Sequence, residues 1–137
     1  MTTTRSTDLA EVLSEAECWE ALASVDLGRL AVRAGDDIDL FPVNYLVTDR
    51  LLYFRTAPGT KMIELTAEPR VAFEADGLLA GRRWSVTLKG IAQRLSSDAE
   101  IGDSGIQRLR SLEPSTKWNY VRVTPSAVTG RRFRPTR

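Results

Sequence analysis

The chain has 137 residues, of which 42% are hydrophobic and 27% charged, a composition typical of one soluble globular domain. Its 19 basic and 18 acidic residues leave a formal net charge of +1, so we expect neither nucleic acid nor a membrane as a partner. Histidine is absent. This excludes histidine general bases, Ser-His-Asp and Cys-His nucleophiles, and zinc sites with histidine ligands.

The sequence shows no sign of export or membrane insertion. Cys18 is the one cysteine, so no disulfide can form within the chain. Residues 1–10 are mostly Thr, Ser and charged residues, without the apolar stretch of a signal peptide. No apolar run approaches the roughly 20 residues that span a bilayer. We therefore expect a cytoplasmic protein.

The N-terminal part predicts a loose tail followed by a capped helix. Residues 1–12 are expected to form a flexible tail, and residues 13–137 a single domain. Ser14 and Glu17 have the spacing of a capping box, and Leu13 stands where a hydrophobic staple begins. The helix is expected to end at Asp26-Leu27-Gly28.

From Gly28 the apolar residues recur at every second position, which is typical of strands. The sequence predicts strands over 28–33, 38–47 and 51–56, with a hairpin turn at 35–37. Pro42 cannot donate to a strand ladder and is expected at an edge or a bulge.

The remaining elements are predicted to be a short helix over 61–67, strands over 71–76, 84–92 and 118–123, and a weak helix over 98–112. Residues 77–83 are expected to form a loop, and 125–137 a basic end segment. Strands that follow one another without alternating helices argue against a doubly wound parallel sheet. They favour a small antiparallel barrel with helical plugs.

The segment from Arg55 to Lys61 carries the clearest chemical signal. It runs from a strand end through a turn into a helix start, which offers free backbone N–H groups and a favourable helix dipole. Arg55, Thr56, Thr60 and Lys61 add side-chain donors that suit a phosphate. The alternative is an ordinary strand-to-helix turn with solvated charges.

Other candidate features have plainer interpretations. Cys18 is expected to be a buried structural residue. Gly102-Asp103-Ser104-Gly105 resembles a serine-protease string, but no triad can be built without histidine. Asn44, an amide in an apolar strand, needs a partner, either a backbone group or a ligand. The carboxylates near residue 36 lie in a turn where solvation suffices, so we expect no metal site.

The basic C-terminus has two interpretations. It is either a solvated tail or an arm that reaches a bound anion or a partner chain. Its arginines are Arg131, Arg132, Arg134 and Arg137.

Five segments, taken in order, resemble the FMN-binding split-barrel family that includes pyridoxamine 5'-phosphate oxidase and small bacterial flavin reductases. Together they cover most of residues 13–132. They are FPVNYLV (41–47), LYFRTAPGTK (52–61), EPRVAFEAD (68–76), WSVTLKGIAQRL (84–95) and VRVTPSAVTGRR (121–132).

This resemblance implies a mainly β fold, a six-stranded antiparallel split β-barrel with a few short helices. It also implies a homodimer with FMN, or a 5-deazaflavin coenzyme as in some relatives, in clefts between the two chains. By motif position, the phosphate would be bound by Arg55, Thr56, Thr60 and Lys61. The isoalloxazine ring would be lined by Pro42, Val43 and Asn44, and approached from another side by Trp84 and Ser85.

The chain departs from the pyridoxamine phosphate oxidases at the C-terminus. Those enzymes carry an arginine and a histidine there for the substrate, whereas this chain has Arg131-Arg132 and no histidine. We therefore expect no vitamin B6 oxidation. Haem, which some relatives bind, would also lack a histidine ligand.

Two function classes remain open. In the first, reduced flavin passes a hydride to a small acceptor such as a quinone or nitro compound. The cofactor carries that chemistry, so no catalytic side chain is predicted. In the second, the protein binds or stores flavin without turnover.

Overall fold

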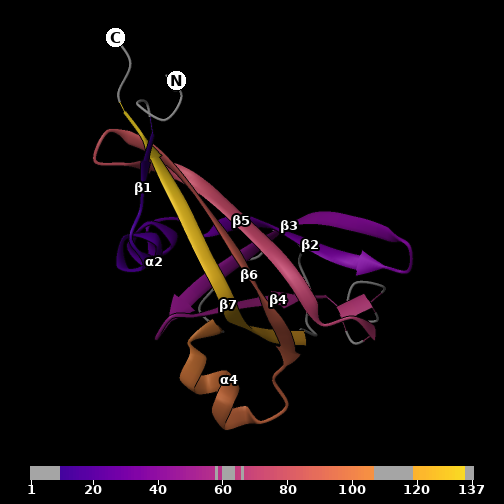
Figure 1. Cartoon of the computed structure of the whole chain (residues 1–137). Coiled ribbons are helices and arrows are strands. Elements are labelled where there is room, and N and C mark those ends of the chain that lie inside the picture. The colour runs from indigo at the N-terminus through magenta and orange to yellow at the C-terminus, as the bar shows by residue number, and fades with distance from the viewer. Residues whose placement is uncertain (1–9, 58, 60–63, 66, 107–118, 135–137) are drawn as a thin grey trace.

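The computed structural model describes residues 10–57, 59, 64–65, 67–106 and 119–134. Within them the chain forms seven strands and two helices (Figure 1). In chain order these are β1 (Ala10–Val12), α2 (Glu15–Ala23), β2 (Leu27–Ala34), β3 (Asp37–Thr48), β4 (Leu51–Thr56), β5 (Arg70–Leu79), β6 (Arg82–Arg94), α4 (Asp98–Ser104) and β7 (Asn119–Phe133).

The strands form one antiparallel sheet that closes on itself. Its order is β1-β7-β4-β3-β2-β5-β6, and β6 returns to pair with β7. The predicted antiparallel barrel is therefore confirmed. The strand count is seven and not six, because Ala10–Val12, expected in the tail, pairs with Arg131–Phe133 of β7. β1 and the end of β7 consequently lie side by side (Figure 1).

Two segments expected to be irregular belong to long strands. β7 continues to Phe133 instead of ending near Val123, since a register shift between Lys89 and Gly90 accommodates Pro125. The loop expected over 77–83 is a tight β5–β6 turn at Ala80 and Gly81, both with positive φ. The sequence did not predict these parts of β5, β6 and β7, because they are basic or contain glycine and depend on pairing with other strands.

The capped helix is confirmed, although it ends at Ala23 with Ser24 as its C-cap and not at Asp26-Leu27-Gly28, since Leu27 already begins β2. The Glu17 amide donates to the Ser14 hydroxyl at 3.1 Å, and the Glu17 carboxylate accepts from the Ser14 amide at 2.9 Å. Its inner face buries Cys18, Trp19 and Leu22. Burial raises the pKa of the Cys18 thiol, which fits the expected structural role.

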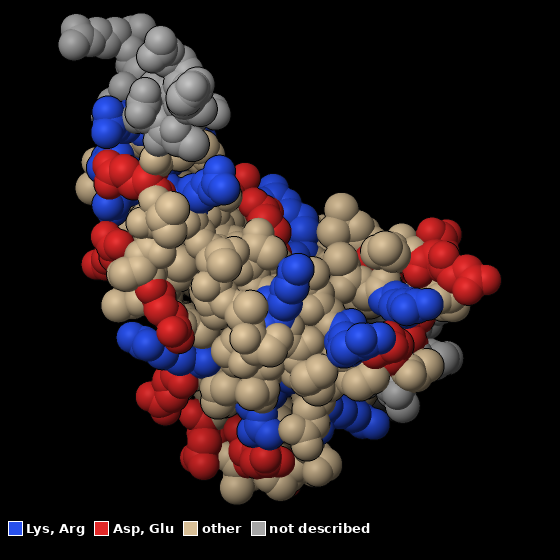
Figure 2. Space-filling model, in the orientation of Figure 1, with Lys and Arg blue, Asp and Glu red and all other residues tan. Residues whose placement is uncertain are grey.

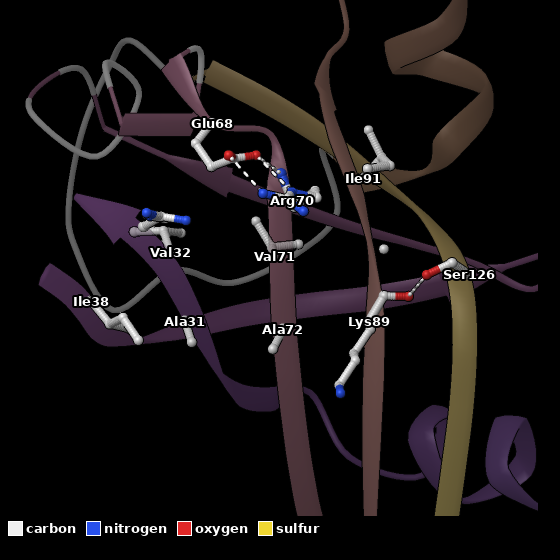
Figure 3. Close-up of a pocket in the computed structure, with 12 residues that line it drawn as sticks. Ala31, Val32, Ile38, Glu68, Arg70, Val71, Ala72, Lys89, Ile91 and Ser126 are labelled. Atoms are coloured by element: carbon white, nitrogen blue, oxygen red, sulfur yellow. Dashed lines mark hydrogen bonds and ion pairs between the residues drawn. The ribbon is translucent and has the colours of Figure 1, made fainter. Parts of the chain in front are cut away.

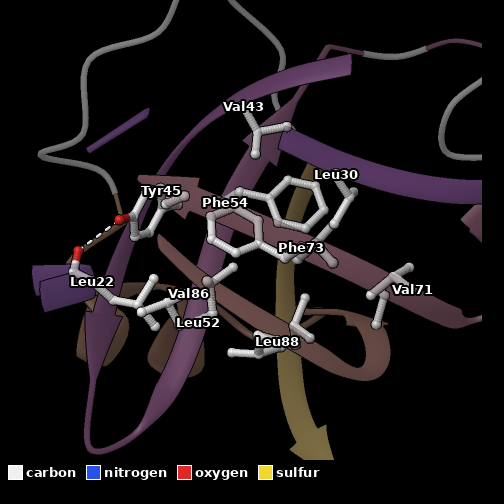
Figure 4. Close-up of a cluster of buried hydrophobic side chains, with 14 of the residues drawn as sticks. Leu22, Leu30, Val43, Tyr45, Leu52, Phe54, Val71, Phe73, Val86 and Leu88 are labelled. Carbon is white, nitrogen blue, oxygen red and sulfur yellow. Dashed lines mark hydrogen bonds between the residues drawn. The ribbon is translucent and has the colours of Figure 1, made fainter. Parts of the chain in front are cut away.

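A hydrophobic core fills the ring (Figure 4). Tyr45 and Phe73 meet edge to face with ring centroids 4.8 Å apart. The Tyr45 hydroxyl donates to the Leu22 carbonyl at 2.6 Å, and burial raises the pKa of this phenol. The core therefore ties α2 to the barrel through packing and one buried hydrogen bond.

The helix expected over 98–112 is shorter. α4 ends at Ser104, because Gly105 takes a left-handed conformation with φ 78°. Residues 107–112 lie outside the described part of the chain. Ile106 packs with Tyr53 and Leu95 in a second apolar cluster on the outside of the barrel. In the described part of the expected 61–67 helix, Glu64, Leu65 and Ala67 are helical.

Among the described residues, neither helix is long and apolar enough to cross a membrane.

Candidate functional site

The structure describes seven of the nine predicted site residues. Thr60 and Lys61 lie outside the described part of the chain. The other seven divide between the two faces of the barrel wall, since successive side chains of a strand point to opposite faces. Pro42, Asn44, Arg55 and Ser85 alternate with buried neighbours and face outward; Val43, Thr56 and Trp84 are buried on the inside.

Three of the outward residues come together on β3 and β4. Tyr45 of β3 pairs with Phe54 of β4. Because the two strands are antiparallel, the next positions beyond this pair are Asn44 in β3 and Arg55 in β4, and Pro42 lies two residues further along β3. The Asn44 amide donates to the Asp26 carbonyl at 3.2 Å. Of the two partners that the sequence allowed for Asn44, the structure shows the backbone group.

The fourth outward residue, Ser85, lies elsewhere on the ring. It pairs with Asp76 of β5 and Arg131 of β7. Around it is a hollow of about 390 Å³, whose other lining residues are Val12, Thr87, Thr129, Gly130 and Arg131. Its polar groups are three hydroxyls and the Arg131 guanidinium, set in an otherwise apolar lining, and part of that lining comes from β7, which was expected to be a basic end segment.

The arginines of that strand have separate environments. Arg131 is exposed beside Ser85, whereas Arg132 pairs with Trp84 and bonds to Glu11 at 3.2 Å and Glu17 at 3.4 Å. Arg132 therefore serves the fold, and Arg131 is left on the outer face.

The sequence did not predict a charged cluster that lies between Pro42, Asn44 and Arg55 on one side and Ser85 on the other. Arg29 of β2 contacts Glu74 at 3.4 Å and Asp76 at 3.3 Å. Arg29 is also paired with Pro42, so the cluster lies between Pro42 and Ser85 across the sheet. Partial burial, then the nearby Asp76, raises the pKa of Glu74. Alternation in the sequence could have placed Arg29 outward, but its partners depend on the non-local β2–β5 pairing.

Another hollow, of about 430 Å³, lies on the outer face of β2, β5 and β6 (Figure 3). None of the seven described candidate residues lines it. Small residues of the three strands make its floor, namely Ala31, Ala72 and Gly90, and cations surround it, namely Arg33, Arg70 and Lys89. The Glu68 carboxylate accepts two hydrogen bonds from Arg70, at 3.1 and 3.2 Å, so the charge of that arginine is compensated.

The outer face offers binding groups and little acid–base machinery. It presents a guanidinium, an amide, hydroxyls and apolar surface to a bound molecule. Among the described residues, no group of three or more Cys, Asp or Glu side chains could hold a metal ion. The arrangement suits a ligand that brings its own chemistry.

Comparisons with known proteins identify the family. A family model described as "Pyridoxamine 5'-phosphate oxidase" matches residues 14–132. A candidate pyridoxamine 5'-phosphate oxidase from Corynebacterium glutamicum superposes with a TM-score of 0.81 and 40% identity, over 90% of this chain and 98% of that one.

Two mycobacterial proteins add to this. The FAD-binding protein from Mycobacterium smegmatis has a TM-score of 0.76 and 36% identity, over 92% of this chain and all of that one. The Mycobacterium tuberculosis protein Rv3129, whose function is uncharacterised, is 39% identical over 89 residues, covering 65% of this chain and 81% of its own length.

Proposed function

The chain belongs to the pyridoxamine 5'-phosphate oxidase family, and we propose that it is a flavin-binding oxidoreductase of that family. The observation that carries the proposal is the outward placement of Pro42, Asn44, Arg55 and Ser85 on one barrel. It is supported by the similarity to the M. smegmatis protein, which binds FAD.

The residues present fit a flavin. Arg55 faces outward at the end of β4, just before the segment with Thr60 and Lys61, and these residues would hold the phosphate of FMN. The exposed Pro42 and the neighbouring Asn44 would lie against the ring. Val43, Thr56 and Trp84 have buried side chains, so they would contribute backbone groups only.

Bound reduced flavin would supply the hydride for a small acceptor such as a quinone or nitro compound. The protein would orient the ring and exclude water, which requires no histidine. FMN is the cofactor that the phosphate motif favours, and FAD or a deazaflavin coenzyme are the alternatives.

We also propose a homodimer with the cofactor between the chains. Asn44 pairs with Leu27 on β2, and Ser85 pairs with Asp76 on β5, so three strand spacings, about 14 Å, separate Asn44 from Ser85 along the sheet. A second barrel would bring its Ser85 to the ring held by the first.

The exposed apolar surface favours the same assembly. Ile38 and Leu40, 69% and 70% exposed, form a ridge on the outer face of β3 that continues to Pro42. The floor of the hollow on β2, β5 and β6 lies beside this ridge, so a two-fold axis could seat each ridge in the other chain's hollow. Figure 2 shows uncharged side chains over much of the centre of one face of the molecule, with most charges towards its edges. An exposed apolar ridge such as that of Ile38 and Leu40 is typical of an interaction site.

We propose no pyridoxal phosphate formation, since the histidine that serves the substrate in pyridoxamine phosphate oxidases is missing. Incubation of the flavin-loaded protein with pyridoxamine phosphate or pyridoxine phosphate should yield none. Flavin-dependent turnover of either substrate would overturn this expectation.

A flavin carrier without turnover is the alternative, and the scarcity of acid–base groups on the outer face favours it. Steady-state oxidation of a reduced nicotinamide with a quinone or nitro acceptor separates the two. A protein that binds flavin tightly but shows no turnover with any acceptor would be a carrier.

The binding site itself is tested by titrating FMN, FAD and a deazaflavin coenzyme into apo protein. Lys61→Ala should weaken binding by about 10- to 100-fold, the value of one charge-assisted hydrogen bond, and Arg55→Ala should rank second. Lys89→Ala, on the rim of the hollow on β2, β5 and β6, is the matched control and should bind as wild type. If Lys89→Ala alone weakens binding, the phosphate lies in that hollow and the assignment to Lys61 is wrong.

A further inference from the structure

An arginine that belongs to none of the five family segments lies beside the proposed flavin surface. Arg29 of β2 is paired in register with Pro42 of β3 on one side and with Glu74 of β5 on the other. All three side chains face outward, since each stands between buried neighbours in its strand. The backbone of Arg29 is therefore one strand spacing, about 5 Å, from that of Pro42.

The guanidinium of Arg29 is accessible and only partly engaged. Its side chain is 44% exposed, and Nη1 makes both of its ion pairs, with Glu74 at 3.4 Å and Asp76 at 3.3 Å. Nε and Nη2 donate to no described residue. These two nitrogens remain for a molecule that lies on the outer face, without either ion pair having to break.

The two carboxylates fix where the guanidinium stands. Glu74 and Asp76 are two positions apart on β5, and both contact the same nitrogen of Arg29. The guanidinium is thereby held over the strip of sheet between Pro42 and Ser85, because Asp76 is in register with Ser85. These are two of the places at which the flavin ring is proposed to be lined.

An exposed ion pair between two strands is the plainer explanation of this cluster. Such pairs add little to stability, and β2 and β5 are already joined by their ladder. Two carboxylates also share one guanidinium here. Partial burial, and then the nearby Asp76, raise the pKa of Glu74, so part of the cluster opposes itself. The cluster therefore contributes little to the fold for the charge that it places on this face.

We propose that Arg29 stabilises the negative charge of the reduced flavin, and that Glu74 and Asp76 position its guanidinium and moderate its charge. This inference rests on the proposed flavin site. Reduction with two electrons and one proton leaves one negative charge on the ring, and charges near the ring nitrogens tune that reaction. Arg29 acts on the flavin itself, whereas Glu74 and Asp76 act through Arg29.

The test measures the two-electron reduction potential of bound FMN or FAD, whichever the wild-type protein binds more tightly. Arg29→Gln should bind the oxidised form nearly as wild type does and the reduced form about tenfold more weakly, the low end for a hydrogen bond to a charged group. That factor corresponds to a potential about 30 mV lower. Arg29→Lys keeps the charge and should stay closer to wild type.

Two further variants give the direction and the control. Glu74→Gln removes an opposing negative charge and should raise the potential. Arg94→Gln removes an exposed arginine at the end of β6 and should leave the potential unchanged. The unfolding midpoint of Arg29→Gln should move little, because its ion pairs are exposed.

The outcomes separate this inference from the function on which it rests. Equal potentials for wild type and Arg29→Gln, or shifts of the same sign for Arg29→Gln and Glu74→Gln, would overturn the inference and leave the flavin site in place. A wild-type protein that binds neither FMN nor FAD would overturn the proposed flavin site, and the inference with it.

Discussion

The two ends of the barrel use their charged and apolar side chains differently. At the end with α2, Glu11 bonds to Arg82 and Arg132, and Arg132 also contacts Glu17, so the charges are paired within the chain. At the end with the β2–β3 hairpin, Ile38 and Leu40 are largely exposed, and Lys89 nearby forms no ion pair with any described residue. Both ends therefore expose apolar side chains, since Val12 at the first end is 84% exposed, but the arginines of the first end are paired within the chain whereas Lys89 at the second has no such partner among the described residues.

This contrast has a physical reason. Helix α2 covers one end of the ring and brings its own acidic side chains to the arginines of β6 and β7. The hairpin extends beyond the ring, as Figure 1 shows, and Ile38 and Leu40 on its outer face are not covered by any described part of the chain. Stability and assembly are therefore expected to depend on different ends of the molecule.

The largest effect on stability is expected from a substitution at Gly28, near the start of β2. A Cβ on Gly28 would overlap the Phe73 ring and come within 2.8 Å of the Glu74 carbonyl oxygen. Gly28→Ala should therefore destabilise the fold by about 3 kcal/mol or more, as measured by urea unfolding. Gly102→Ala is the control: nothing lies within 4 Å of the added Cβ, and alanine favours the helix. A Gly28→Ala protein as stable as wild type would contradict the packing of β2 against β5.

A smaller effect, on assembly alone, is expected at the hairpin end. Leu40→Asp should leave the unfolding midpoint of the monomer nearly unchanged, because the side chain is exposed, and should weaken dimerisation by at least about tenfold. Light scattering over a concentration series measures this. Leu78→Asp, on an equally apolar and 59% exposed residue near the α2 end, should keep the dimer mass. If Leu78→Asp dissociates the dimer and Leu40→Asp does not, the interface lies at the other end.

The smallest effect concerns the paired charges of the α2 end. Hydrogen bonds from Arg82, then Arg132, hold the pKa of Glu11 below its usual value. A carboxyl group whose pKa is lowered in the folded state stabilises it above the unfolded pKa, and this contribution is lost as the pH falls through the folded pKa. Thermal unfolding between pH 7 and pH 3 should therefore show a smaller acid-induced loss for Glu11→Gln than for wild type.

Glu20→Gln is the control for this comparison, since Glu20 is exposed and forms no ion pair with any described residue. It should lose stability on acidification as wild type does. Equal acid sensitivity of Glu11→Gln and wild type would show that the pairing of Glu11 adds nothing to stability.

Local signals in the sequence were sufficient for much of the fold. The capping box of α2 involves residues three positions apart, so its atoms meet as soon as the helix forms. The alternation in β2 and β6 reports directly which side chains face the core, whereas β3 and β4 are apolar on both faces and do not. Residues two positions apart in a strand share a face, which places Pro42 and Asn44 together on β3, and the resemblance between the five segments and the family predicted the closed antiparallel sheet.

Tertiary structure alone decided the arrangements that depend on pairing between distant segments. β1 is three residues long and has no periodicity, and only the edge of β7 makes it a strand. Arg131 joins Ser85, and Arg29 joins Glu74 and Asp76, through pairings between residues more than 40 positions apart. Trp84 belongs to the family motif and was therefore predicted to line the site. Its side chain nevertheless lies on the opposite face from Ser85, because successive side chains of a strand alternate. The sequence alone thus determined where most of the helices and strands lie, and the closure of the ring decided β1, the full length of β7 and which faces of the strands meet.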